Sequence, residues 1–142
     1  VASRRAARLV SERTRSTQES RLRYIWVVEA GLPEPLVNVA IYSRLDGAFL
    51  GEGDLLDPEA ALVGECDGRV HLSLEQRTYD HAREEGLEGA NLVVTRATSQ
   101  DLRPSRRQHL AWRLRQRRRQ GLARDRSRDR WALATPTSAR PW

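Results

Sequence analysis

The pattern of hydrophobic and polar positions along the chain predicts a mixed α/β domain. Four short segments rich in Val, Ile and Leu, bounded by Gly, Pro, Asp or Asn, are typical of β-strands. Longer segments with apolar residues three and four apart are typical of helices. The expected elements are helices at 3–15 and from 16 to a stop at Gly31, strands at 36–43, 48–57 and 60–66, a helix at 72–89, a strand at 91–97 and a helix at 104–123.

The order of these elements predicts how the sheet is connected. The first three strands are separated by short turns, so we expect antiparallel hairpins. The third and fourth strands are joined by a helix, which requires a right-handed crossover and a parallel pair. We therefore expect an α/β sandwich with a mixed sheet.

The same pattern divides the chain into four regions. We expect an N-terminal helical extension at 1–15, a core at 16–102 and a basic C-terminal helix at 103–123. Residues 124–142 contain turn-forming residues and little periodicity, and we expect them to be disordered unless a partner orders them.

Charge is distributed unevenly along the chain. Residues 1–100 contain 12 Arg and 16 acids, a net charge of −4, whereas residues 101–142 contain 13 Arg and 3 Asp, a net charge of +10. Such an asymmetry is typical of proteins that bind nucleic acid, although a merely solvated tail is the alternative. All 25 basic residues are Arg, so a mechanism that needs a lysine ammonium is excluded.

Other features of the composition narrow the class. The lone Cys66 excludes an internal disulfide and a cysteine-ligated zinc finger, and a reducing cytoplasm fits best. No stretch of about 18 apolar residues is present, so we expect no membrane span.

The basic helix is predicted to contact DNA phosphates. Its arginines nearly surround it and leave only a narrow apolar stripe of Leu102, Leu110 and Leu114 for docking. Arg forks match phosphate oxygens and position a duplex without reading its sequence. The predicted nucleic-acid-binding residues are Arg106, Arg107, Arg113, Arg115, Arg117, Arg118 and Arg119.

Two acids are predicted to meet at the ends of neighbouring strands. If the strands at 48–57 and 60–66 pair, Asp54 and Glu65 lie on one face with Cβ atoms about 4.5–5.5 Å apart. Carboxylates that close repel each other unless a proton or a cation lies between them. Carboxylate ligands suit Mg²⁺ or Mn²⁺, which activate water and polarise a phosphodiester.

The segment around these acids resembles the active-site segment of PD-(D/E)xK nucleases. Asp54 is followed by Glu65-x-Asp67-Gly68-x-x-His71, which is similar to the very-short-patch-repair endonuclease-like group, including an actinobacterial family of endonuclease-like domains. Further matches to that family are Ser16, Glu19, Ser20, Leu22, Arg23, Gly31, Leu32, Pro33 and Pro35 upstream, and more loosely Asp80, Arg83, Val93, Val94, Thr95 and Thr98 downstream. Over about residues 16–102 the resemblance implies a restriction-endonuclease-like α-β-β-β-α-β core.

The resemblance implies a role for each matching residue. Asp54 would be the central metal ligand and Glu65 the second acidic ligand, with Glu19 reaching the metal from the first helix through water. His71 would act near the attacking water or the phosphate. Asp67 stands where many of these nucleases carry a lysine; it could bind a second metal or orient water, but it cannot stabilise a developing negative charge.

Each of these residues also has a structural alternative. Ser16 and Glu19 fit a helix capping box. Asp67-Gly68 is typical of a type I′ turn, which would pair the strand at 60–66 with residues 69–74. Asp54 could begin the turn before Pro58, and His71 could be a surface histidine.

Together these features predict a metal-dependent DNA endonuclease-like domain that uses Mg²⁺ or Mn²⁺ and no small-molecule cofactor. The alternative is a catalytically inactive DNA-binding or regulatory module with the same fold, of the defence or antitoxin-like kind, which the absence of lysine favours. A third hypothesis is a basic adaptor for protein or RNA.

Overall fold

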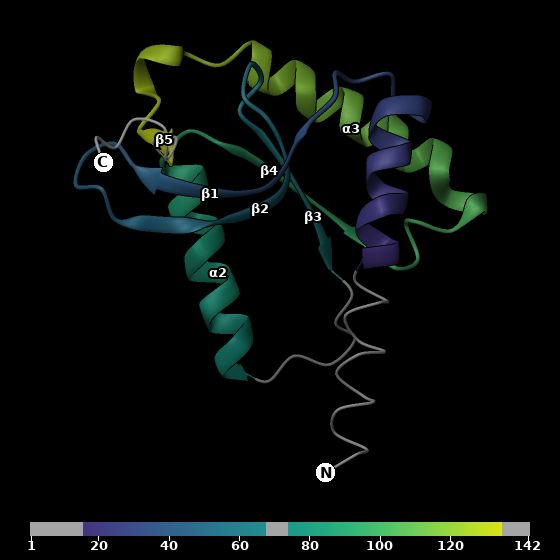
Figure 1. Cartoon of the computed structure of the whole chain (residues 1–142), viewed down its shortest axis with the longest axis horizontal. Helices are drawn as coiled ribbons and strands as arrows, with labels where there is room; N and C mark the ends of the chain where they lie inside the picture. The colour runs from purple at the N-terminus through teal and green to yellow at the C-terminus, as the bar shows by residue number, and fades with distance from the viewer. Residues whose placement is uncertain (1–15, 68–73, 135–142) are drawn as a thin grey trace, which may run out of the picture.

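In the computed structural model, residues 16–67 and 74–134 are described, and they form a five-stranded mixed sheet with helices on both faces (Figure 1). Residues 16–24 are α-helical and continue as a π-helix, η1 (Ile25–Glu29). The strands are β1 (Leu36–Ser43), β2 (Phe49–Asp57), β3 (Leu62–Asp67), β4 (Val93–Thr98) and β5 (Trp131–Leu133). The other helices are α2 (Leu74–Gly89), η2 (Pro104–Arg106), α3 (Arg107–Leu122) and η3 (Arg126–Arg128). In the described part of the chain, no helix is long and apolar enough to cross a membrane.

The sheet has the connectivity that the sequence predicts. The strand order is β4-β3-β2-β1-β5, and β1–β2 and β2–β3 are antiparallel. The crossover through α2 places β4 parallel to β3. The predicted hairpins, the parallel pair and the mixed α/β class are therefore confirmed.

One face of the sheet is covered by the helix at 16–29 and by α3. Trp26 is fully buried there, and its indole donates a hydrogen bond to the Pro33 carbonyl (3.0 Å). The Trp26 ring lies directly over Gly64, where an added Cβ would be 2.7 Å from a ring carbon. The absence of a side chain at residue 64 thus lets the first helix pack closely on β3.

The helix α3 belongs to the same core, although its sequence is dominated by arginine. Leu110, Ala111 and Leu114 are buried against this face, so the narrow apolar stripe is sufficient for docking. Near its end, Gly121 lies against the turn between β2 and β3, and a Cβ on Gly121 would be 1.8 Å from the Ala60 carbonyl oxygen. Only glycine allows this contact.

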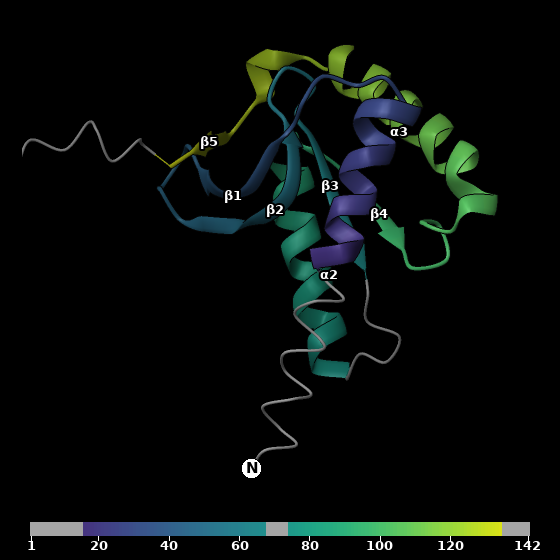
Figure 2. The same ribbon diagram turned by 45° about the vertical axis from the view of Figure 1, so that its right-hand side comes forward.

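The other face of the sheet is covered by α2, whose contacts differ from those the sequence suggests. The helical period would allow Leu74 and Tyr79 to face the core, but they are 80% and 66% exposed, because the first turns of α2 project beyond the sheet (Figures 1 and 2). Leu87 is its buried apolar residue, packing with Leu56 and Val63. The middle of α2 presents polar side chains to the sheet.

The expectation of disorder from residue 124 is wrong for residues 124–134. This segment forms η3 and β5, and β5 pairs with the free edge of β1, where Trp131 is buried. Arg124 and Asn91 both hydrogen-bond the Asp129 carboxylate, which ties the segment to the end of α2. Residues 135–142 and the expected helix at 3–15 lie outside the described residues.

Candidate functional site

Asp54 and Glu65 lie on the α2 face of two neighbouring strands. The β2–β3 register pairs Leu56 with Val63 and Leu55 with Gly64, so the next residues along it are Asp54 and Glu65. Because Leu56 and Val63 pack beneath α2, the alternation of a strand directs Asp54 and Glu65 to the same side. The prediction that these acids share a face of paired strands is confirmed, but they lie inside the two strands, where the β2–β3 pairing ends, and not at the strand ends.

Asp54 ends the pairing between the two strands. Its Oδ2 accepts a hydrogen bond from the Cys66 backbone N–H (2.9 Å), a group of the facing strand. The carboxylate therefore takes the place of a backbone carbonyl at the point where the ladder ends. Asp54 stays partly exposed.

Glu65 is buried and is compensated by two arginines. One carboxylate oxygen accepts a hydrogen bond from the Arg83 guanidinium of α2, and the other is 3.8 Å from Nε of Arg96 on β4. Arg96 is also within 4.0 Å of Asp80 and 3.6 Å of Glu84, both on α2. We call Glu65, Asp80, Arg83, Glu84 and Arg96 the acid–arginine cluster.

Arg83 is fixed in the acid–arginine cluster by both charge and shape. Burial alone would lower the pKa of Arg83, but the hydrogen bond and charge of Glu65 and the charges of Asp80 and Asp54 outweigh burial and raise it above its ordinary value. The side chain also crosses Gly51, where an added Cβ would be 2.8 Å from Arg83 Nε. The guanidinium is therefore permanently charged and close to both acids.

The structure places the remaining predicted site residues less directly. Glu19 belongs to the helix on the opposite face, whose described start lies at the end of the sheet where β3 and β4 end (Figure 2). Ser16 is already helical, which does not fit an N-cap. Asp67 is the last residue of β3 and pairs with Thr98. His71 lies outside the described residues. Of the alternative hairpin partner at 69–74, only Leu74 is described, and it is helical.

The donor set partly fits a divalent cation. Within residues 16–67 and 74–134, no group of three or more His, Cys, Asp or Glu side chains could hold a metal ion. Mg²⁺ needs only one or two carboxylates, because it keeps several waters. Asp54 meets this requirement, whereas Glu65 can join only when its ion pair with Arg83 opens.

Several arginines predicted to bind DNA also contact other groups of the protein. Arg113 donates to the Arg96 carbonyl (2.6 Å) and lies 3.3 Å from Asp101. Arg118 donates to Asp57 (2.9 Å). The other contacts place the Arg107 guanidinium over the Tyr24 ring, Arg115 on the Glu29 carbonyl and Arg117 on Gln120.

Two of the predicted DNA-binding arginines, Arg106 and Arg119, are exposed, and their side chains make no hydrogen bond, ion pair or ring contact with the described part of the chain. Both lie on the α3 side of the sheet, whereas Glu65 faces α2. The basic helix and the acids are therefore on opposite faces of the sheet.

Sequence reasoning gave no role to Arg83 and did not consider Arg96. Asp80, Arg83, Glu84 and Leu87 are spaced i, i+3, i+4 and i+7, which predicts one helical face. Arg96 stands in the otherwise uncharged strand VVTRAT, where a charge needs a partner. These two signals together could have indicated the acid–arginine cluster.

No protein-family model, no curated protein and no solved structure matches this chain. The resemblance to PD-(D/E)xK nucleases over residues 16–102 therefore stays a prediction.

Proposed function

We propose that this chain is a metal-dependent DNA endonuclease-like domain that hydrolyses phosphodiester bonds. The observation that carries the proposal is the position of Asp54 and Glu65, adjacent on one sheet face where the β2–β3 ladder ends. Asp54 is partly exposed at this point, so a cation can reach it, and the buried Glu65 can join when its ion pair with Arg83 opens. The restriction-endonuclease-like arrangement of the core is part of the same proposal.

Asp54 and Glu65 would hold a Mg²⁺ or Mn²⁺ ion, which supplies a polarised phosphate and an activated water when bound. The chain itself supplies Arg83, whose guanidinium shares the site with both acids. Released from Glu65, this fork can pair with phosphate oxygens. Arg83 thus offers the positive charge that Asp67, in the place of a lysine, does not.

DNA affinity would come from exposed arginine on the α3 side. Arg106 and Arg119 are exposed, and residues 101–142 carry a net charge of +10. Contacts of this kind bind phosphates and depend strongly on salt. We therefore propose binding with little sequence preference.

A second candidate is a DNA-binding module that has no catalytic activity. The two arginines on Glu65 favour it, because a compensated carboxylate needs no cation. In this case the acid–arginine cluster stabilises the contact between α2 and the sheet, and the exposed arginines alone give function.

The two candidates are separated by incubating supercoiled plasmid with the protein and Mn²⁺. If the domain is a nuclease, nicking requires Mn²⁺, stops with EDTA and falls by about a hundredfold in Asp54→Asn and Glu65→Gln. Glu85→Gln changes an exposed acid of α2 outside the cluster, and it should retain full activity. Salt-sensitive DNA retention without nicking would support the binding module, and nicking that persists in Asp54→Asn would contradict the proposed site.

A further inference from the structure

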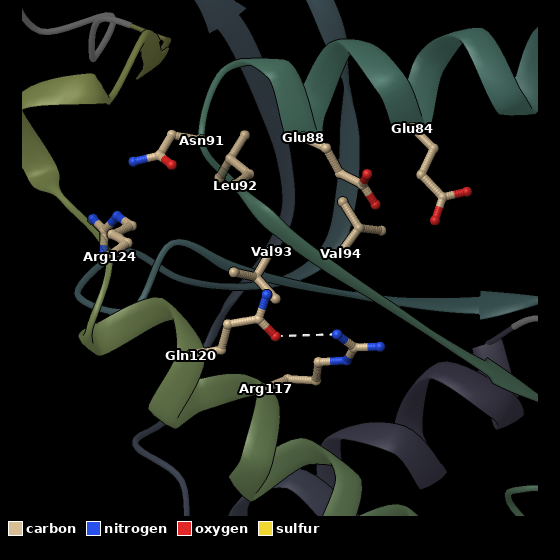
Figure 3. Close-up of a pocket in the computed structure, with 9 residues that line it drawn as sticks. All are labelled: Glu84, Glu88, Asn91, Leu92, Val93, Val94, Arg117, Gln120 and Arg124. Atoms are coloured by element: carbon tan, nitrogen blue, oxygen red, sulfur yellow. Dashed lines mark hydrogen bonds between the residues drawn. The ribbon is translucent and has the colours of Figure 1, made fainter.

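We propose that the free edge of β4 binds an extended peptide segment of another protein, with a basic and an acidic side chain at adjacent positions. The strand β4 is at one edge of the sheet, and a groove of about 550 Å³ runs along it between α2 and α3. Figure 3 shows Val93 and Val94 of β4 between Glu84 and Glu88 of α2 on one side, and Arg117 and Gln120 of α3 on the other. The groove shares Glu84 with the acid–arginine cluster, but peptide binding there does not depend on nuclease activity.

The backbone of β4 is open where the groove lies. Val93 donates its N–H to the Ala61 carbonyl (2.8 Å), so Val93 faces β3 and, by alternation, Val94 points its N–H and C=O outward. Further along this edge, the Arg96 carbonyl accepts from Arg113 (2.6 Å), and the Thr98 N–H donates to Asp101 (3.0 Å). Among the described residues, the outward groups of Val94 have no hydrogen-bond partner. An added strand would supply these bonds.

The two walls of the groove carry opposite charges. The described acids on the α2 side are Glu84 and Glu88, and Arg117 lies on the α3 side. Within the described residues, neither Glu88 nor Arg117 takes part in an ion pair, although Arg117 hydrogen-bonds Gln120 (3.1 Å). The groove therefore presents both charges to a ligand.

The pleat of the sheet determines which ligand side chain meets which wall. Val94 packs in the core beneath α2, and Val93 packs against the core beneath α3. In an added strand, the residue opposite Val94 would direct its side chain toward Glu84 and Glu88, and its neighbours would point toward Arg117. A basic residue next to an acidic residue satisfies both walls.

A second copy of the chain fits this edge less well than a single strand. In an antiparallel β4–β4 dimer, α2 would face α2 and α3 would face α3, so that glutamates oppose glutamates and arginines oppose arginines. The helices that form the groove would also compete for the same space. A lone extended segment avoids both conflicts.

The test is a titration of the isotope-labelled protein with end-blocked peptides, followed by amide NMR shifts. The probe is Thr-Val-Thr-Lys-Glu-Val-Thr, and its matched control, Thr-Val-Lys-Thr-Glu-Val-Thr, places both charges on one face of a strand. We expect the probe to shift the amide of Val94 and to bind about tenfold more tightly than the control. Two probes that are N-methylated at alternate sets of residues should differ in affinity. N-methylation removes backbone hydrogen-bond donors, and only one of the two sets of amides points to β4.

Charge reversal in the protein tests the assignment of the walls. Glu88→Arg or Arg117→Glu should each weaken binding of the probe by about tenfold. The double variant should restore the affinity, because the bound probe can shift its register by one residue and so exchange the faces that carry its Lys and Glu. Glu85→Arg and Arg119→Glu, exposed residues of the same helices outside the groove, are the controls. Equal binding of probe and control, equal effects of both N-methylation patterns, or self-association through this edge without peptide binding would overturn the proposal.

Discussion

Asp57 and Glu65 are buried acids on neighbouring strands, and each pairs with arginine, but their partners differ in kind. Asp57 accepts hydrogen bonds from the backbone N–H groups of Glu59 (3.0 Å) and Ala60 (3.4 Å) as well as from Arg118 (2.9 Å). Glu65 is held by the side chains of Arg83 and Arg96. Backbone donors cannot move without refolding the turn, whereas a guanidinium can exchange one anion for another.

This difference separates a structural acid from a candidate functional one. Asp57 joins the β2–β3 turn to α3, and one of its oxygens is held by two fixed backbone N–H groups. Glu65 sits beside Asp54, a second carboxylate that remains partly exposed. We infer that a buried acid compensated only by side chains, next to another acid, is the better position for binding a cation or a phosphate.

The largest expected effect is on stability, and it should separate the two acids. Asp57→Ala removes a turn cap and a buried ion pair, and we expect it to lower the free energy of unfolding by about 3 kcal/mol. Glu65→Ala should cost about 1 kcal/mol, because each arginine retains other partners. Arg83 retains its hydrogen bond to the Glu52 carbonyl, and Arg96 retains its ion pairs with Asp80 and Glu84. Urea unfolding followed by circular dichroism measures both, and equal losses would contradict the distinction.

A third acid extends the comparison to pH. Burial alone would raise the pKa of Asp129, but hydrogen bonds from Arg124 and Asn91 and the charges of Arg124 and Arg44 outweigh burial and lower it. Since the folded pKa lies below the ordinary value of 3.8, Asp129 stabilises the fold above about pH 4, and this contribution is lost as the pH falls through the lowered folded pKa.

We therefore expect Asp129→Asn to cost about 2 kcal/mol at pH 7 and progressively less as the pH falls below about 4. Thermal unfolding across this range measures the difference. Asp46→Asn, which removes the charge of an aspartate at an exposed turn, is the matched control. A cost for Asp129→Asn that does not change with pH would show that its charge is not what stabilises the fold.

The smallest effects should appear in the salt dependence of DNA binding. Arg106→Ala and Arg119→Ala each remove an exposed guanidinium, and each should reduce the slope of log affinity against log salt by about 0.9. Arg118→Ala should lower stability but leave the slope unchanged, since Arg118 holds Asp57. Fluorescence anisotropy at several salt concentrations measures the slope, and an equal change in all three variants would show that ion-paired arginines also bind DNA.

The sequence predicted those features that depend on neighbours along the chain. Strands β1 to β4 were located within two residues of their ends, because β-branched runs end at Gly, Pro or Asp. The shared face of Asp54 and Glu65 followed from the alternation of side chains along two strands that were expected to pair. Both predictions need only local information.

The features that the sequence did not predict depend on contacts between distant segments. The short strand β5 lacks alternation and forms because the edge of β1 is free. The exposure of Leu74 and Tyr79 follows from how far α2 extends past the sheet, which periodicity alone does not indicate. Arg96 meets Glu65 only because β4 lies parallel to β3 in one particular register.

The most direct test of the proposed site is a Mn²⁺ titration followed by electron paramagnetic resonance, in which free Mn²⁺ gives the signal. We expect the protein to bind Mn²⁺, Asp54→Asn to lose this binding, and Arg83→Gln to tighten it by about tenfold, because the arginine no longer competes for Glu65. Glu85→Gln should bind as the unchanged protein does. Mn²⁺ binding that is absent, or that persists unchanged in Asp54→Asn, would contradict a cation site at these two acids.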